Sequence, residues 1–101
     1  EIPEIIPQST IAEGIAIPQP PRGKQIMEIL RKTEGKVLQV QEEEILKGMK
    51  ALSSQGILAE PTSAVAVAAF LKTPEERGKR VLIPITGSGL KTPEHYRKIL
   101  F

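Results

Sequence analysis

The stretch RVLIPITGSGLKTPEH, residues 80 to 95, joins a continuous apolar run to a glycine-rich turn and then to a helix start. Such a run of Val, Leu and Ile is typical of a strand that is covered on both faces, as in a parallel sheet. The glycines that follow predict a turn at the carboxyl end of this strand, where open α/β sheets bind ligands. The segment therefore predicts an α/β fold with a ligand site near residues 86–89.

The glycine turn resembles a phosphate-binding P-loop, but it does not match that motif. A Walker loop requires G-x-x-x-x-G-K-[ST]. Here Leu90 separates Gly89 from Lys91. In addition, Pro84 stands where the first glycine is needed. What remains is a hydroxyl, that of Thr86, followed by glycine backbone at the end of the predicted strand.

Upstream segments alternate between helical and strand patterns. Apolar residues at spacings of three and four predict an amphipathic helix over residues 23–33 that stops by Gly35. The short run KVLQV, residues 36–40, predicts a buried strand. A further helix is predicted from Glu42, where acidic residues favour the positive end of the helix dipole, to a stop at Gly56.

The segment AEPTSAVAVAAFLK, residues 59–72, allows two interpretations. The alternation in AVAVA fits a strand, whereas the length of the apolar run fits a helix. We favour the helix, because Pro61 suits a first helical turn and Thr62 or Ser63 can supply a capping hydroxyl. Thr92-Pro93-Glu94 is predicted to open a last helix that runs to Leu100.

The predicted order is helix, strand, helix, helix, strand, helix. Because helices join the strands at 36–40 and 80–86, these strands are expected to be parallel. The predicted architecture is a partial three-layer sandwich of parallel strands flanked by helices, since two strands alone do not make a self-sufficient sheet. Residues 1–22 form a Pro-rich extended entry segment, and residues 23–101 form the α/β segment.

Composition excludes several classes of protein. The chain has 101 residues, a net charge of +2, 3% aromatic residues and no Cys, with its basic residues scattered along the sequence. The chain lacks the clustered basic stripe that is typical of nucleic-acid binders, so no nucleic-acid partner is expected. Its apolar stretches are too short to predict a membrane span. No metal site is expected either. We expect a cytoplasmic protein. The lack of Asp, Asn and Cys beside abundant Lys and Glu predicts a thermophilic source.

A resemblance to a known family covers most of the chain. The blocks that carry it, in this order, are TIAEGIAI (10–17) with the following PPRG, EGKVLQVQEEEI (34–45), EPTSAVAVAAF (60–70) and VLIPITGSGLK (81–91). They resemble the carboxyl-terminal part of threonine synthase, which belongs to the fold-type-II, tryptophan-synthase-β-like enzymes that use pyridoxal 5′-phosphate (PLP). Related dehydratases share several blocks, but their last strand typically ends in a serine-glycine-glycine turn, whereas T-G-x-G-L-K is similar to the synthase version.

The resemblance implies roles for particular residues. The Thr86 hydroxyl would contact the pyridine nitrogen of PLP, and Gly87 and Gly89 would let the backbone approach the ring. Glu60 would lie near that edge of the site, and Gly14 near the substrate. The family often has Asp after the lysine of this motif, whereas this chain has Thr, which can also cap the final helix.

The resemblance also implies what this segment lacks. The family's Schiff-base lysine and its glycine-rich phosphate loop lie in the amino-terminal half, and nothing here matches either. No catalytic residue is therefore assigned within this chain. We expect a carboxyl-terminal fragment of a lyase of threonine biosynthesis, inactive alone, that pairs with the amino-terminal part or forms a homo-oligomer. The complete enzyme would convert O-phospho-L-homoserine and water to L-threonine and phosphate.

Two other hypotheses stay open. The chain could be a fragment of a related PLP-dependent serine/threonine dehydratase. It could also be a free-standing, non-catalytic α/β module that works by association through its unsatisfied sheet edge.

Overall fold

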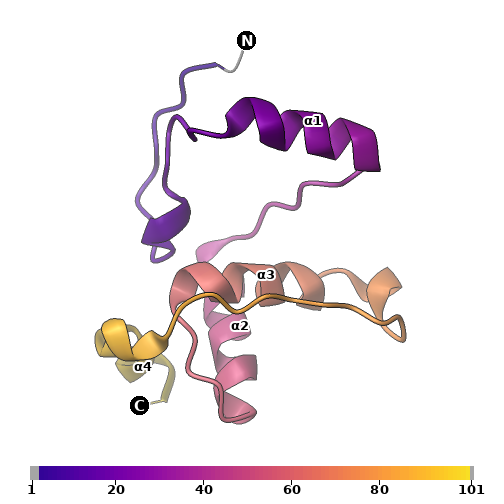
Figure 1. The fold of residues 1–101 in the computed structure, drawn as a ribbon. Helices are drawn as coiled ribbons and strands as arrows, with labels where there is room; N and C mark the ends of the chain where they lie inside the picture. Colours follow the sequence, from indigo (N-terminus) through magenta and orange to yellow (C-terminus); the bar gives the residue numbers. More distant parts are fainter. Residues whose placement is uncertain (1–2, 101) are drawn as a thin grey trace.

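A computed structural model describes residues 3–100 of the chain. Its elements are η1 (Glu13–Ile15), α1 (Gly23–Thr33), α2 (Glu42–Ser54), α3 (Pro61–Leu71), η2 (Pro74–Glu76), η3 (Gly89–Lys91) and α4 (Pro93–Leu100), where η marks a short 3₁₀ helix. Figure 1 shows α3 lying across α2, with α4 beside them and α1 set apart.

The predicted helices are confirmed, including the choice of helix over strand for α3. Local signals account for their ends. Gly56 adopts φ +79°, and the amide of Ile57 donates to the carbonyl of Leu52 at 3.0 Å, which closes α2 in a Schellman turn. Helix α1 ends at Glu34, which is in the left-handed region at φ 53°. Because these interactions span only a few residues, sequence patterns identify them.

The strand predictions at 36–40 and 80–86 are wrong for this structure. Within residues 3–100 no segment forms a regular strand, and the β-type pairing is an isolated antiparallel bridge between Ala59 and Ser88. Most apolar residues of the predicted strands are exposed, Val37 by 78% and Leu82 by 91%, whereas Val40 is half-buried against the core. A strand needs a neighbour to satisfy its backbone, and neither segment has one here. The three-layer sandwich stays a prediction.

The core forms where α2 meets α3. Its buried residues are Ala12, Ile45, Met49, Ala64 and Tyr96. The helices approach closely at Gly48, where an added Cβ would lie 2.7 Å from the carbonyl oxygen of Ala64 and 3.1 Å from the amide nitrogen of Ala68. Small residues on both helices therefore permit backbone contact, and the resulting core is small.

The entry segment is attached to the start of α2. Glu42 accepts hydrogen bonds from the hydroxyl of Thr10 and, at 3.0 Å, from the amide of Ile11. Glu42 thus ties the entry segment to the first turn of α2. In the same turn, Glu44 accepts from Lys72 at 2.9 Å and from the amide of Gln41 at 2.7 Å. These two donors lower the pKa of the Glu44 carboxyl, with the Gln41 amide as the larger cause.

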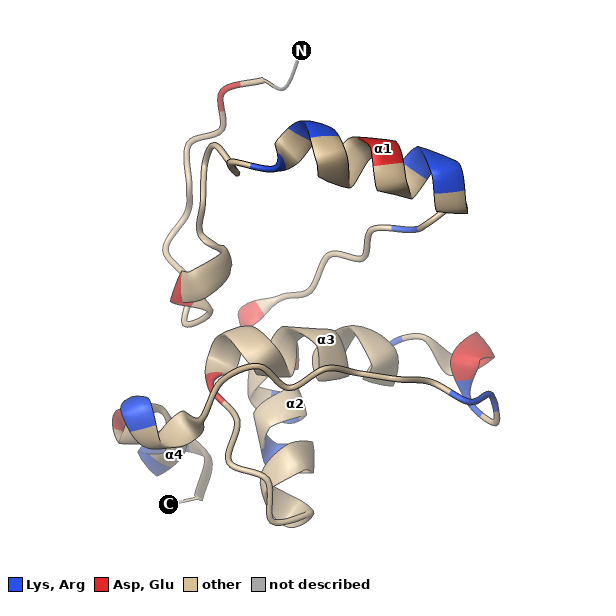
Figure 2. Cartoon of the chain, in the orientation of Figure 1, with Lys and Arg blue, Asp and Glu red and all other residues tan. Residues whose placement is uncertain are grey.

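Charged side chains are spread over the elements other than α3, which carries none (Figure 2). Helix α1 is amphipathic, yet its apolar side chains Ile26 and Ile29 are 48% and 59% exposed. Its apolar face therefore has little cover in this arrangement.

None of the helices described between residues 3 and 100 has the length and apolar character needed to cross a membrane.

Candidate functional site

The glycine turn is held against the segment that leads into α3. The amide of Gly89 donates to the carbonyl of Leu58 at 2.8 Å, and the amide of Glu60 donates to the carbonyl of Gly87 at 3.0 Å. These bonds flank the bridge between Ala59 and Ser88. The structure thus brings together Thr86, Gly87, Gly89 and Glu60, which the sequence analysis placed in one site.

A buried serine holds the start of this turn. Ser63, on the first turn of α3, is only 4% exposed. Its Oγ accepts from the amides of Thr86 at 3.1 Å and Gly87 at 3.0 Å, and it lies 3.1 Å from Thr86 Oγ1. The prediction that Ser63 or Thr62 caps α3 is wrong, because the cap position belongs to Glu60 and neither hydroxyl makes a capping bond.

Thr86 itself is exposed to solvent. Ser63 nevertheless holds its backbone amide and lies within hydrogen-bond distance of its hydroxyl. Such a hydroxyl is available to a ligand that approaches from the solvent side. Sequence reasoning missed Ser63 as a site residue, since the contact joins positions 23 residues apart.

The two glycines of the turn are explained by close contacts within the chain. A Cβ on Gly87 would overlap the carboxylate of Glu60. A Cβ on Gly89 would overlap the ring of Tyr96 and lie 3.0 Å from the carbonyl oxygen of Ala59. Gly89 is therefore required for packing against α4, whereas Gly87 faces a flexible side chain.

The acidic residue of the site has a basic neighbour. The carboxylate of Glu60 lies 3.8 Å from the ammonium of Lys91, and their side chains are 27% and 68% exposed. Such a long, exposed pair stabilises the fold little. Because Glu60 also fills the space beside Gly87, it forms one wall of the turn.

Thr92, which follows Lys91, does not form the helix cap that its residue type allowed. Its hydroxyl is buried and has no hydrogen-bond partner among the described residues. The capping role that the sequence allowed for this residue is therefore not realised in the structure.

Gly14 lies against Thr62 in the first turn of α3. Its amide donates to Thr62 Oγ1 at 3.1 Å, and an added Cβ would lie 2.9 Å from the same oxygen. The structure thus places the entry segment and the glycine turn at adjacent residues of α3. Gly14 itself belongs to η1, a single 3₁₀ turn.

Tyr96 supports the turn from α4. It is 6% exposed, and its hydroxyl donates to the carbonyl of Ala59 at 2.6 Å. Burial raises the pKa of the phenol. Nothing in the sequence identifies this contact, since 37 positions separate the residues.

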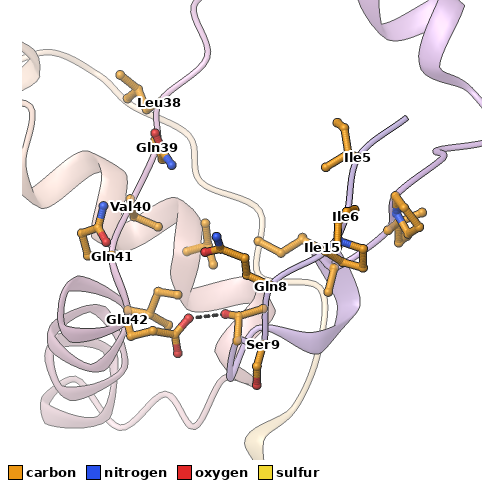
Figure 3. A pocket seen from close by; sticks show the side chains of 17 residues that line it. Ile5, Ile6, Gln8, Ser9, Ile15, Leu38, Gln39, Val40, Gln41 and Glu42 are labelled. Atoms are coloured by element: carbon orange, nitrogen blue, oxygen red, sulfur yellow. Dashed lines mark hydrogen bonds between the residues drawn. The ribbon is translucent and has the colours of Figure 1, made fainter. Parts of the chain in front are cut away.

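A separate open groove of about 660 Å³ lies between the entry segment and the chain that leads into α2 (Figure 3). Its walls carry Ile5, Ile15, Leu38 and Val40, with Glu42 at the end where it bonds the entry segment. None of the described residues that line it belongs to the predicted cofactor contacts. The groove and the glycine turn are therefore distinct features.

Across residues 3–100 no group of three or more His and Glu side chains gathers in a way that could hold a metal ion.

Comparison with known sequences identifies the family of the chain. Residues 2–87 match the family described as pyridoxal-phosphate dependent enzyme. The chain belongs to this family of PLP-dependent enzymes, whose fold-type-II members are α/β proteins.

Among its relatives, the chain is similar to threonine synthase. It is 33% identical to threonine synthase of Mycobacterium tuberculosis over 90 residues, which are 84% of this chain and 25% of the relative. It is 34% identical to threonine synthase of Methanocaldococcus jannaschii over 99 residues, 90% of this chain and 24% of the relative. It is also 37% identical to L-threonine ammonia-lyase of Thermotoga maritima over 82 residues, 80% of this chain and 20% of the relative. The chain thus spans about a quarter of the length of the threonine synthases it matches.

Proposed function

We propose that this chain forms the part of a threonine synthase that faces the ring nitrogen of PLP, with the Thr86 hydroxyl as the ring contact. The observation that carries the proposal is the geometry of Thr86, an exposed residue whose backbone amide and hydroxyl are held by Ser63. When bound, PLP supplies an electron sink for a carbanion on the amino-acid substrate. In the complete enzyme this substrate is O-phospho-L-homoserine.

A hydroxyl at this position determines how strongly the ring withdraws electrons. It can donate a hydrogen bond to an unprotonated pyridine nitrogen, but it has no negative charge with which to stabilise a protonated one. The Thr86 hydroxyl therefore fits a PLP ring whose pyridine nitrogen is unprotonated. Gly87 and Gly89 give the turn its shape, while Glu60 stands beside Gly87. Gly14 approaches the same end of α3.

A second candidate is the dehydratase reaction, which the similarity to an L-threonine ammonia-lyase supports. The chain carries T-G-S-G-L-K at residues 86–91, which favours the synthase. In the whole protein that contains this chain, release of phosphate from O-phospho-L-homoserine would support the synthase. Release of ammonia from L-threonine, without phosphate release from O-phospho-L-homoserine, would favour the dehydratase.

Thr86→Asp in the whole protein tests the ring contact. An aspartate stabilises a protonated ring nitrogen, so we expect loss of threonine formation or diversion to side products, whereas Thr86→Ser should retain the wild-type product. An unchanged rate and product ratio in the Asp variant would contradict the proposal. Absence of PLP binding by the wild-type protein would instead favour the association module.

We also propose that the rest of the enzyme covers the exposed apolar segments 36–40 and 80–86, where it would supply the missing neighbouring strands. The adjacent exposed pairs Val37–Leu38 and Val81–Leu82 carry this part of the proposal, because contiguous exposed apolar surface marks contact with other protein. A cytoplasmic location is part of the same proposal.

A further inference from the structure

We infer that Ser63 is a positioning residue that orients the Thr86 hydroxyl so that its proton points toward the cofactor ring. This inference rests on the proposed function, in which Thr86 contacts the ring nitrogen. It concerns a residue on α3 that touches the turn and not the ring.

The argument begins with the hydrogen-bonding capacity of Ser63. A serine hydroxyl has two acceptor lone pairs and one proton. Both acceptor positions of Ser63 Oγ are used, by the amides of Thr86 at 3.1 Å and Gly87 at 3.0 Å. The contact of 3.1 Å with Thr86 Oγ1 is therefore one in which Ser63 donates.

The direction of the Ser63–Thr86 hydrogen bond determines where the proton of the Thr86 hydroxyl can point. Because Thr86 Oγ1 accepts from Ser63, its own proton cannot point at Ser63. Among the described residues, Thr86 Oγ1 has no other side-chain hydrogen bond, and the residue is exposed. The proton is thus available to an acceptor on the solvent side, as an unprotonated pyridine nitrogen requires.

Burial strengthens the arrangement. Ser63 is 4% exposed, so water does not compete freely for its hydroxyl, and a buried polar group without its partners is unfavourable. Chains of hydrogen bonds also polarise one another, so a donor behind Thr86 makes its hydroxyl a better donor in turn. Ser63 therefore sets both the direction and the strength of the Thr86 contact.

The test uses the whole protein loaded with PLP that carries ¹⁵N at the ring nitrogen. The ¹⁵N resonance reports hydrogen bonding at that atom, which a purely structural role of Ser63 would not alter. We compare Ser63→Ala with Thr86→Val, which removes the proposed donor. Ser53→Ala is the control, since the Ser53 hydroxyl bonds only within its own helix, to the carbonyl of Lys50.

We expect Thr86→Val and Ser63→Ala to move the resonance in the same direction, toward the value for a ring without a donor, and Ser53→Ala to leave it unchanged. Binding of PLP should weaken about tenfold in Ser63→Ala, as for the loss of one hydrogen bond. Amide hydrogen exchange of Gly87 in the protein without PLP should accelerate as well, because the acceptor of that amide is removed.

The outcomes separate the inference from the proposed function. If Thr86→Val moves the resonance and Ser63→Ala does not, the inference is overturned and the Thr86 contact stands. If neither variant moves it, the Thr86 contact and the inference both fail. Should Ser63→Ala not fold, Ser63→Cys keeps a side chain of similar size with a weaker donor, and an unmoved resonance in that variant would overturn the inference.

Discussion

The hydroxyl of Tyr96 on α4 donates a 2.6 Å hydrogen bond to the backbone carbonyl of Ala59, the residue that pairs with the glycine turn. The same ring lies against Gly89. One side chain thus contacts both segments of the candidate site and fixes the distance between α4 and the chain that leads into α3. Replacing it tests how strongly α4 supports the turn.

Tyr96→Phe should lower the free energy of unfolding by about 1 kcal/mol, because the ring stays while the hydrogen bond is lost. The substitution should also change the response to alkaline pH. Burial raises the pKa of the Tyr96 phenol above its ordinary value of about 10, so above that pH the unfolded chain ionises first. The contribution of Tyr96 is complete below about pH 10 and is lost as pH rises toward the folded pKa.

Urea unfolding between neutral and alkaline pH measures both effects. The difference in stability between wild type and Tyr96→Phe should shrink as pH rises through this window. Since the chain has one Tyr, no other phenol contributes. A difference that stays constant with pH would show that the phenol has an ordinary pKa.

Gly89→Ala should destabilise the protein by about 1–3 kcal/mol, as is typical of overpacking, because its Cβ meets the Tyr96 ring and a backbone carbonyl. Gly87→Ala should have a smaller effect, since the Glu60 carboxylate in its way is the end of a flexible side chain. Thermal unfolding of both variants measures which substitution destabilises the protein more. Adding Glu60→Ala should reduce the effect of Gly87→Ala and leave that of Gly89→Ala unchanged.

Gly48→Ala should destabilise the packing of α2 on α3. Alanine favours a helix over glycine by about 1 kcal/mol, but here its Cβ would lie 2.7 Å from the Ala64 carbonyl oxygen, where backbone must move. We expect a net loss of stability in urea unfolding. The exposed Ser54→Ala on the same helix is the control and should be neutral or stabilising. A stabilised Gly48→Ala protein would mean that the helices are further apart than described.

Glu42→Gln should loosen the entry segment. The Glu42 carboxylate accepts from the amide of Ile11 at 3.0 Å and from the Thr10 hydroxyl, and bonds to a charged acceptor are stronger than those to a neutral one. Hydrogen exchange at the Ile11 amide should accelerate about tenfold. Glu43→Gln is the matched control, because Glu43 is the exposed neighbour. Equal exchange in both variants would exclude Glu42 as the anchor.

Leu82→Asp in the whole protein tests whether the segment 80–86 is covered there. Leu82 is 91% exposed in this chain, so in isolation the substitution should have little effect. If other strands cover Leu82, the substitution would bury a charge without a partner. The free energy of unfolding should then fall by about 3 kcal/mol or more. The exposed Lys98→Glu serves as control. A thermal unfolding temperature equal to that of wild type would contradict the proposed cover.

The helices could be predicted from the sequence because their signals are local. Periodic apolar residues, Pro61 at the first turn of α3 and Gly56 after α2 act over a few positions, and the structure confirms each. The grouping of Thr86, Gly87, Gly89 and Glu60 could also be predicted, since a glycine turn and an α3 start carry recognisable sequence blocks. The structure brings these residues together, while their contact with PLP stays a prediction.

Strands and supporting contacts depend on distant partners. Residues 36–40 and 80–86 have the composition of buried strands, but composition does not supply the neighbouring backbone that a strand requires. The contacts of Ser63 with Thr86, of Tyr96 with Ala59 and of Glu42 with Ile11 join positions far apart in the chain. The sequence by itself therefore determined the helices, the turn and the resemblance to a family. Only the tertiary structure decided which side chains hold the turn, because hydrogen bonds between distant residues form only once the packing of α2, α3 and α4 has brought them together.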